Sequence, residues 1–223
     1  MIDYDYHLID IVYHISILLS IAFGTKPTEQ CGRRSMDIGL RRGTVAVVQH
    51  RAEWETAAEQ TVRLLRDILG DTAADVQHVG STAVKTICAK PIIDIAVGVP
   101  VLDDILGFND VLAENGFIFR GQDVPEQYLY VCGTDDVRTH HIHVVSCGSE
   151  AWENYVNMRD YLNCHAEEAQ AYSALKQRLA EQYPNDRAAY TAMKSEMIGE
   201  LLRRARQWRG ADIQREYPVF SGK

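Results

Sequence analysis

One carboxylate and two imidazoles are the residues of this sequence best suited to hold a metal ion. Asp94 lies within the apolar run IIDIAVGV, and His141 and His143 lie within the run RTHHIHVV. A carboxylate in an apolar strand is costly to ionise unless it meets a cation, a metal ion or several hydrogen-bond donors. Two imidazoles two residues apart on a strand point to the same side and can ligate one metal ion or one phosphate. We therefore predict that Asp94, His141 and His143 converge in one catalytic, metal-binding site.

Each of these residues also has a purely structural interpretation. Asp94 could form a buried ion pair with Lys85, Lys90 or Arg138, because many buried ion pairs are structural. The histidines could lie on a solvated edge strand. Three histidines within four residues, next to an arginine, leave both interpretations open.

A turn that carries two hydroxyl groups precedes the Asp94 strand. Gly80, Ser81 and Thr82 lie between two predicted strands. Backbone N–H groups and hydroxyls in such a turn could hold a phosphate. The tripeptide is common in tight turns, so it is weak evidence by itself.

The elements that must position these residues are predicted to be strands followed by helices. Apolar alternation and short apolar runs predict strands over residues 45–48, 76–79, 92–99, 117–119, 128–131 and 137–146. A three-to-four spacing predicts helices over residues 53–69 and 102–114. Alternation along residues 92–99 places Asp94 and Ala96 on one face, and the neighbouring isoleucines on the other.

From Trp152 onward the apolar period is helical. The triplet Pro184-Asn185-Asp186 breaks the pattern and predicts a helix N-cap. The helix after it carries a packing stripe of Tyr190, Met193, Met197, Leu201, Ala205 and Trp208. The whole pattern predicts an α+β protein, with a mixed β-sheet flanked by helices and a C-terminal helical pair.

The composition is that of a globular protein with an acidic surface. The chain has 223 residues, 46% hydrophobic residues and a formal net charge of −8. Such a charge argues against broad nucleic-acid binding, although a local basic pocket stays possible. The five cysteines form no CxxC pair, which argues against a disulfide framework or a zinc ribbon. We expect free, mostly buried thiols in the reducing cytoplasm.

The N-terminal part differs from the rest of the chain. Residues 1–44 read as an apolar extension and linker, residues 45–209 as the main domain, and residues 210–223 as an irregular tail. The apolar stretch 8–23 is interrupted by Asp10 and His14, so we expect no membrane span. It is predicted to be an additional helix that packs on the domain or on a partner chain, which would give a homodimer.

Several blocks in a fixed order resemble the GrpB (UPF0157) family. They are HVGSTAV, AKPIIDIAV and HHIHVV, followed by a tryptophan and the segments RDYL, LK and DRAAY and a final lysine. The resemblance covers roughly residues 45–206. Members of this family are similar to the nucleotidyltransferase superfamily, and some are fused to bacterial dephospho-CoA kinases. The resemblance therefore implies a nucleotidyltransferase-like fold.

The resemblance also implies roles for particular residues. Gly80 and Ser81 stand where the superfamily holds the nucleoside triphosphate, and Asp94 stands at its first metal-binding carboxylate. This layout implies phosphoryl transfer assisted by Mg²⁺. Ala96 stands at the second carboxylate position, so that pair is broken. His141 and His143 stand on the later strand that carries the third carboxylate, which shifts the metal preference from Mg²⁺ toward Mn²⁺ or Zn²⁺.

These observations lead to three hypotheses about function. The first is a metal-dependent enzyme that transfers a nucleoside monophosphate from a nucleoside triphosphate to an unknown acceptor. Its predicted nucleotide-binding residues are Gly80, Ser81, Thr82, Lys90, Arg138 and Arg159. Asp160 either holds Arg159 at the site or forms only a helical surface ion pair with it. The second is a nucleotide- or phosphate-binding module that has lost its chemistry. The third is an interaction or folding-assistance domain, which the kinase fusions suggest.

Overall fold

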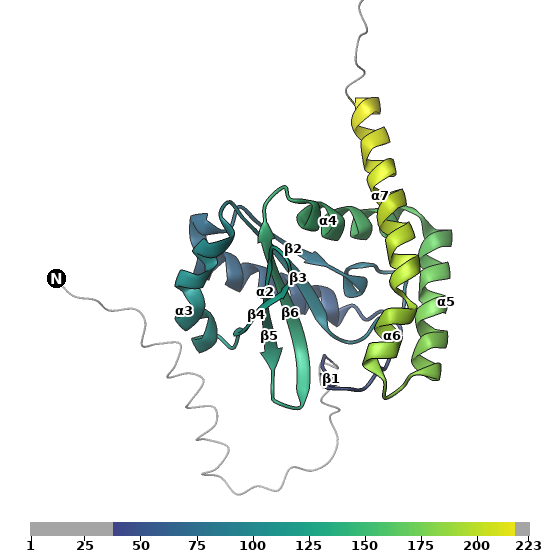
Figure 1. The fold of residues 1–223 in the computed structure, drawn as a ribbon, viewed down its shortest axis with the longest axis horizontal. Coiled ribbons are helices and arrows are strands. Elements are labelled where there is room, and N and C mark those ends of the chain that lie inside the picture. The colour runs from purple at the N-terminus through teal and green to yellow at the C-terminus, as the bar shows by residue number, and fades with distance from the viewer. Residues whose placement is uncertain (1–37, 217–223) are drawn as a thin grey trace, which may run out of the picture. The chain divides into compact units, whose positions relative to one another are not determined.

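A mixed β-sheet forms the centre of the fold, in a computed structural model that describes residues 38–216 (Figure 1). Its strands are β1 (Leu40–Arg41), β2 (Asp75–Val79), β3 (Ile93–Val99), β4 (Ile118–Val124), β5 (Gln127–Gly133) and β6 (Val137–Ser146). The strand order is β2-β3-β6-β5-β4, and β1 also pairs with β6. Strands β3 and β6 are parallel, whereas the other neighbours are antiparallel. The predicted α+β mixed sheet is confirmed.

One face of the sheet packs against helix α2 (Glu53–Leu69), whose bounds are those predicted. Ile93 and Ile95 of β3 and Ile142 of β6 join Trp54 and other buried residues of α2 in the largest core cluster. The alternation along β3 and β6 therefore sends their aliphatic side chains to this face. The opposite face is left to Asp94 and the two histidines.

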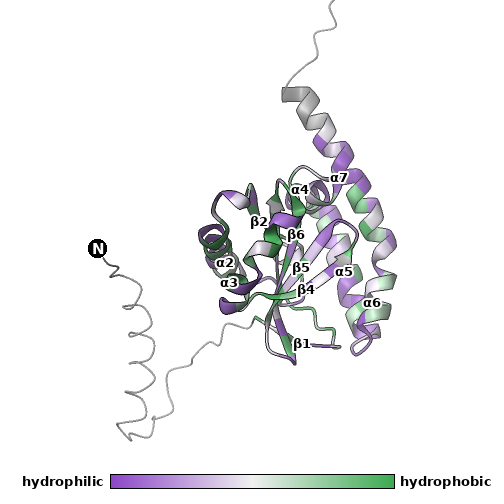
Figure 2. Ribbon diagram, turned by 60° about the vertical axis from the view of Figure 1, so that its left-hand side comes forward, coloured by the Kyte–Doolittle hydropathy of each residue, from purple (hydrophilic) through white to green (hydrophobic). Residues whose placement is uncertain are grey.

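The second face of the sheet is covered by helix α4 (Glu150–Cys164), whose Trp152 packs on Ala96 and Val145. Helices α5 (Ala166–Gln182), α6 (Arg187–Met193) and α7 (Ser195–Glu216) lie beyond it (Figure 1). Hydrophobic and hydrophilic residues alternate along α7, as expected for a helix with one packed face (Figure 2). The candidate site therefore lies between two layers, under the C-terminal helices.

Some elements differ from their prediction. Residues 45–48 form no strand, because Val45 bonds to Pro184 while Val48 makes an isolated bridge with Ala89. Residues 102–114 form a 3₁₀-helix, Leu102–Phe108, and then helix α3, Asn109–Glu114. Gly107 interrupts this segment and lowers its helix propensity. Leu40 and Arg41, in the predicted linker, pair with β6.

The last predicted helix is two helices that meet at Lys194. Asp186 caps α6 through a 2.9 Å bond from the Ala189 N–H, as predicted. The Ser195 hydroxyl then bonds to the Ala192 carbonyl oxygen at 2.6 Å, which competes with the helical hydrogen bonds. Met193 of the predicted stripe is 55% exposed at this junction. Helix α7 continues to Glu216, into the segment predicted to be irregular.

Four cysteines lie among the described residues, and all four are free. Cys88 is buried, but Cys147 and Cys164 are exposed, so the prediction of mostly buried thiols is wrong. Both exposed cysteines lie at or next to the ends of elements, where side chains reach solvent. Within residues 38–216, no helix is long and apolar enough to cross a membrane. The predicted helix at 8–23 and its dimer contact lie outside the described residues.

Candidate functional site

Asp94, His141 and His143 lie together, with one ligand atom from each within 4.8 Å of the others. The Asp94 Oδ1 atom is 3.2 Å from His141 Nδ1 and 3.4 Å from His143 Nε2. The side chain of Asp94 is 27% exposed, and those of His141 and His143 are 15% and 14% exposed. The predicted convergence of these three residues is thus present in the structure.

The register of two parallel strands produces this cluster. On β3 and β6, Asp94 is aligned with His141, and Ala96 is aligned with His143. The ring of His143 also stacks on Tyr155 of α4, with 4.9 Å between centroids and 29° between planes. Its Nδ1 atom is buried and finds no hydrogen-bond partner among the described residues, so stacking orients this ring.

The two imidazoles determine the ionisation of Asp94. Burial opposes the charged form, but the hydrogen bonds from His141 and His143 outweigh it and hold the pKa of this carboxyl well below its usual range. Lys85, one of the alternative structural partners, instead pairs with Glu55 at 2.8 Å. Asp94 is therefore a carboxylate whose nearest polar partners are the two imidazoles.

Gly80 of the predicted turn is in van der Waals contact with Asp94. Its backbone has φ 69° and ψ −167°, a conformation that residues other than glycine rarely adopt. A Cβ atom at this position would lie 2.6 Å from Asp94 Oδ2. Glycine is needed here both for the turn and for the space that the carboxylate occupies.

Ala96 occupies the place of a second carboxylate, and its surroundings are apolar. It is fully buried and packs with Val79, Val145 and Trp152. Trp152 also approaches Gly98, where an added Cβ would lie 3.0 Å from the indole. A carboxylate at residue 96 would be desolvated under this ring. With alanine at this position, the described cluster has one carboxylate and two imidazoles.

A cavity of about 230 Å³ next to this cluster collects positive charge. Its lining includes Ser81, Asp94 and His141 together with four cationic side chains, Lys90, Lys176, Arg187 and Lys194. We call it the cationic cavity. Burial, then repulsion by Lys194 and Arg187, lowers the pKa of Lys90 to about 8. Burial, then Lys194, lowers the pKa of Lys176 to about 7. An anion bound here would relieve this repulsion.

Only Lys90 of these four cations was predicted as a nucleotide-binding residue. Lys176, Arg187 and Lys194 come from helices or helix junctions, where the sequence pattern indicated packing. The family resemblance does include all three: Lys176 lies in the segment LK, Arg187 lies in DRAAY, and Lys194 is the final lysine. That resemblance was the signal that could have identified them.

Thr82 and Arg138 lie at the edge of the site and are held by other partners. The Thr82 hydroxyl faces His78 Nε2 at 2.9 Å. Arg138 is buried, and its Nη1 donates to the Thr134 carbonyl oxygen at 2.8 Å. Their nucleotide-binding roles stay predictions.

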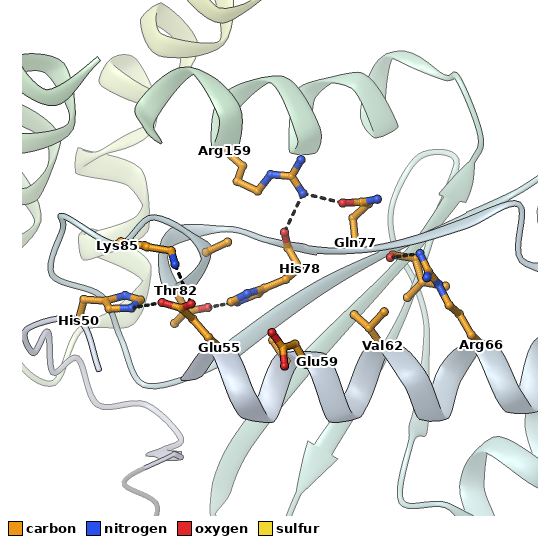
Figure 3. A pocket seen from close by; sticks show the side chains of 13 residues that line it. His50, Glu55, Glu59, Val62, Arg66, Gln77, His78, Thr82, Lys85 and Arg159 are labelled. Atoms are coloured by element: carbon orange, nitrogen blue, oxygen red, sulfur yellow. Dashed lines mark hydrogen bonds and ion pairs between the residues drawn. The ribbon is translucent and has the colours of Figure 1, made fainter. Parts of the chain in front are cut away.

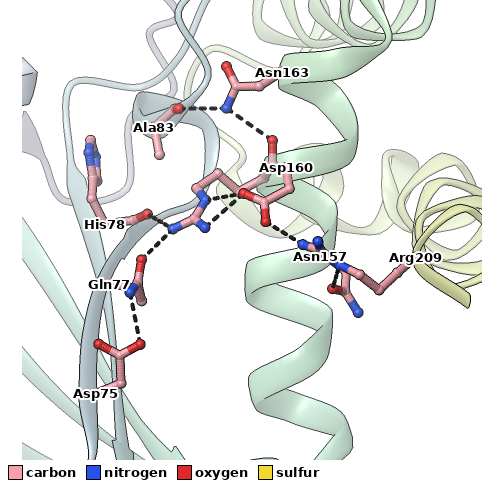
Figure 4. A network of polar contacts seen from close by, with 9 residues as sticks. Asp75, Gln77, His78, Ala83, Asn157, Asp160, Asn163 and Arg209 are labelled. Carbon is pink, nitrogen blue, oxygen red and sulfur yellow. Dashed lines mark hydrogen bonds and ion pairs between the residues drawn. The ribbon is translucent and has the colours of Figure 1, made fainter. Parts of the chain in front are cut away.

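Arg159 links helix α4 to strand β2 (Figure 3). Its Nη1 donates to Gln77 Oε1 at 2.8 Å and to the His78 carbonyl oxygen at 3.1 Å. Its Nε donates to Asp160 Oδ1 at 2.8 Å, and Arg209 binds the other side of Asp160 (Figure 4). Asp160 contacts Arg159, which both alternatives for this pair predict. The nucleotide-binding role of Arg159 stays a prediction.

On the other side of the turn, a cavity of about 350 Å³ opens between α2 and β2 (Figure 3). Glu55 is contacted there by Lys85 at 2.8 Å and by His50 at 3.4 Å. Arg66 pairs with Asp75 at 3.0 Å. These charges largely satisfy one another, so this cavity has no net attraction for an anion comparable to that of the cationic cavity.

His78 makes the stability of the protein depend on pH. Burial lowers its pKa to about 4, whereas in the unfolded chain a histidine titrates near about 6.5. Between these values the unfolded chain binds more protons, so the free energy of unfolding falls as the pH is lowered. The shift corresponds to a loss on the order of 3 kcal/mol.

We expect urea unfolding at pH 7 and pH 4.5 to show a smaller loss of the free energy of unfolding for His78→Gln than for the wild type. An equal loss would contradict this assignment. Some pH dependence should remain, because burial also lowers the pKa of His140 to about 4.

Comparison with known proteins identifies the family. The family model described as GrpB protein matches residues 44–204. The glutamate-rich protein GrpB of Alkalihalophilus pseudofirmus is 37% identical over 170 residues, which cover 74% of this chain and 98% of that protein. The crystal structure of the conserved protein GrpB from Enterococcus faecalis is similar with a TM-score of 0.68 and 26% identity, over 73% of this chain and 99% of that chain. The Cid1 poly(U) polymerase is a more distant match, with a TM-score of 0.38 and 15% identity over 59% of this chain and 45% of that chain. Because the family model covers most of the described residues, and the first relative is matched over nearly its whole length, this chain belongs to the GrpB protein family.

Proposed function

We propose that this protein is a metal-dependent nucleotidyltransferase, which transfers a nucleoside monophosphate from a nucleoside triphosphate to an acceptor. The observation that carries the proposal is the position of the Asp94, His141 and His143 cluster at the wall of the cationic cavity. A triphosphate needs a metal ion and several cations next to one another, and this arrangement offers candidate ligands for the ion together with the cations. A nucleoside triphosphate substrate also favours a cytoplasmic location.

Two of the three distances between ligand atoms of the cluster fit a divalent metal ion, and all three ligand atoms lie within 4.8 Å of one another. In a tetrahedral site with bonds of about 2.0–2.1 Å, neighbouring ligand atoms are roughly 3.4 Å apart. The distances from Asp94 Oδ1 to His141 Nδ1 and His143 Nε2 are 3.2 and 3.4 Å. Two imidazoles and one carboxylate favour Zn²⁺ or Mn²⁺ over Mg²⁺. A bound ion would supply Lewis-acid stabilisation of a phosphoryl oxygen.

The other residues of the cavity are suited to bind the leaving phosphates. Lys90, Arg187 and Lys194 offer charged donors, and the Ser81 hydroxyl lies in the same lining. Hydrogen bonds from charged donors to phosphate oxygens are stronger than neutral ones. We assign these residues to the β- and γ-phosphates, with the α-phosphate next to Asp94.

One observation favours a second candidate function, a nucleotide- or phosphate-binding module without catalysis. Ala96 removes the second carboxylate, and it packs with Val79, Val145 and Trp152 in apolar surroundings. This module would bind the same triphosphate but would transfer nothing. Binding and transfer therefore have to be measured separately.

The test of the proposal uses the full chain loaded with Mn²⁺ or Zn²⁺. Tripolyphosphate binding is measured by titration calorimetry, and transfer of label from α-³²P-labelled ATP is measured against small hydroxyl compounds, transfer RNA and proteins. Tripolyphosphate binding together with label transfer would support the enzyme. Binding without transfer to any acceptor would favour the non-catalytic module, and absence of binding would contradict both.

A single lysine in the cationic cavity should control phosphate affinity. We expect Lys194→Met to weaken tripolyphosphate binding by about 10- to 100-fold, because a hydrogen bond to a charged group contributes roughly 1.5–3 kcal/mol. Lys85→Met is the matched control, since Lys85 pairs with Glu55 and lines the cavity between α2 and β2. The control should bind tripolyphosphate as the wild type does. Equal affinities for the two variants would remove Lys194 from the phosphate site.

A further inference from the structure

Besides the cationic cavity, a cavity of about 440 Å³ borders Asp94. We call it the second cavity. It shares Ser81, Asp94 and Lys194 with the cationic cavity. His141 lines the cationic cavity, whereas His143 lines the second one. Because these histidines are two residues apart on β6, the cavities follow one another along the strand. Asp94 and the candidate metal site lie between them.

The walls of this second cavity are mainly apolar. They include Val84, Met158, Leu162, Ile198 and Leu202 and the rings of Tyr155 and Tyr172. Lys194, Ile198 and Leu202 are spaced by four residues, so the beginning of α7 presents one continuous side to the cavity. The volume is within the roughly 300–1,000 Å³ of small-molecule sites.

The cavity also has charged and polar groups. Arg159 and Gln127 are already engaged, whereas Asn154 Oδ1 is buried and has no hydrogen-bond partner among the described residues. Arg159 is held by Gln77, the His78 carbonyl oxygen and Asp160. Gln127 Oε1 accepts a 2.8 Å hydrogen bond from the Tyr155 hydroxyl. Asp94 is the one carboxylate in the lining, so a polycation would find no set of partners here. An uncharged, mainly apolar compound matches the walls best.

The direction of the proposed reaction assigns a role to this cavity. In phosphoryl transfer the attacking and leaving oxygens lie roughly in line across the phosphorus atom. With pyrophosphate in the cationic cavity and the α-phosphate next to Asp94, the attacking oxygen must approach from the opposite side. We infer that the second cavity binds the acceptor, an uncharged and mainly apolar compound that carries a hydroxyl group. This inference rests on the proposed function.

The bonds and protons of this step balance without a further reactant. The acceptor oxygen forms a bond to the α-phosphorus atom, and the bond from that phosphorus to the bridging oxygen of the β-phosphate breaks. Pyrophosphate leaves with the electron pair into the cationic cavity. The hydroxyl proton passes to solvent water.

The experiment uses 2-naphthol, a planar apolar alcohol, as the probe for the second cavity, and tripolyphosphate as the probe for the cationic cavity. Both are titrated into the metal-loaded full chain. We expect 2-naphthol to bind equally well with and without saturating tripolyphosphate. Ile198→Trp fills the apolar wall and should weaken 2-naphthol at least 10-fold while leaving tripolyphosphate affinity unchanged. Met193→Trp adds the same bulk at an exposed residue and should change neither affinity.

The outcomes separate this inference from the proposed function. If ATP displaces 2-naphthol and tripolyphosphate does not, the nucleoside occupies the second cavity and the acceptor assignment is wrong, although the proposed function stands. If 2-naphthol fails to bind, or binds Ile198→Trp as well as wild type, the assignment is also wrong. If tripolyphosphate itself fails to bind, the proposed function fails. Leu202→Trp, on the same wall, replaces Ile198→Trp if that variant does not fold.

Discussion

Asp94→Asn is expected to abolish the proposed metal binding and nucleotidyl transfer while preserving the fold. Both imidazoles face Asp94 Oδ1. The negative charge of Asp94 would therefore stabilise a cation bound between the three side chains. The amide has the same shape but no negative charge. Loss of even a residue that supports a metal ligand typically costs 10–100-fold in affinity, so losing the carboxylate ligand should cost more than about 100-fold.

The measurement is the metal content of dialysed protein, by atomic spectroscopy, together with thermal unfolding. Asp75→Asn is the matched control, because Asp75 also accepts hydrogen bonds on a neighbouring strand, from Arg66 and Gln77, but lines neither cavity at Asp94. The control should bind metal as the wild type does. Stoichiometric metal in Asp94→Asn would show that Asp94 is not a ligand.

Gly80→Ala is expected to cause the second large effect, the loss of the site geometry together with a loss of stability. Its backbone conformation costs a residue with a side chain roughly 1–3 kcal/mol. The new methyl group would also lie 2.6 Å from Asp94 Oδ2, so the carboxylate or the turn must move. Because Asp94 holds both histidines, we expect metal affinity to fall at least as far as stability does.

Gly116→Ala provides the control for backbone strain alone. Gly116 has φ 83°, but an added Cβ would meet no atom within 4 Å. Urea unfolding should show a loss on the order of 1 kcal/mol for this variant, while its metal affinity stays at the wild-type value. A Gly80→Ala protein that keeps full metal affinity would mean that the turn does not position Asp94.

The sequence alone determined most elements whose apolar pattern is long. Helix α2 and strand β6 have the predicted bounds, and β3 begins one residue later than predicted. Residues 45–48 show where this reasoning fails. A short β-branched run has strand propensity, but it becomes a strand only if a neighbour offers a full set of hydrogen bonds. Here two different segments supply those bonds.

The shared face of His141 and His143 followed from the sequence, because alternation on a strand is local. Their meeting with Asp94 did not follow from spacing alone, since 47 residues separate Asp94 from His141. It depends on the parallel pairing of β3 with β6 and on the register that aligns these two residues. A shift by one residue would turn the side chains of one strand to the other face.

The cationic cavity was decided by the tertiary structure. Its charged side chains come from residues 90, 176, 187 and 194, and no local period relates these positions. Lys90 was predicted to bind nucleotide, but Lys176, Arg187 and Lys194 read as ordinary surface or packing residues along their own segments. Docking of α5 and the junction of α6 with α7 places them around Asp94. Sequence periodicity reports which face of an element is apolar, whereas the convergence of charges from several elements depends on how those faces pack.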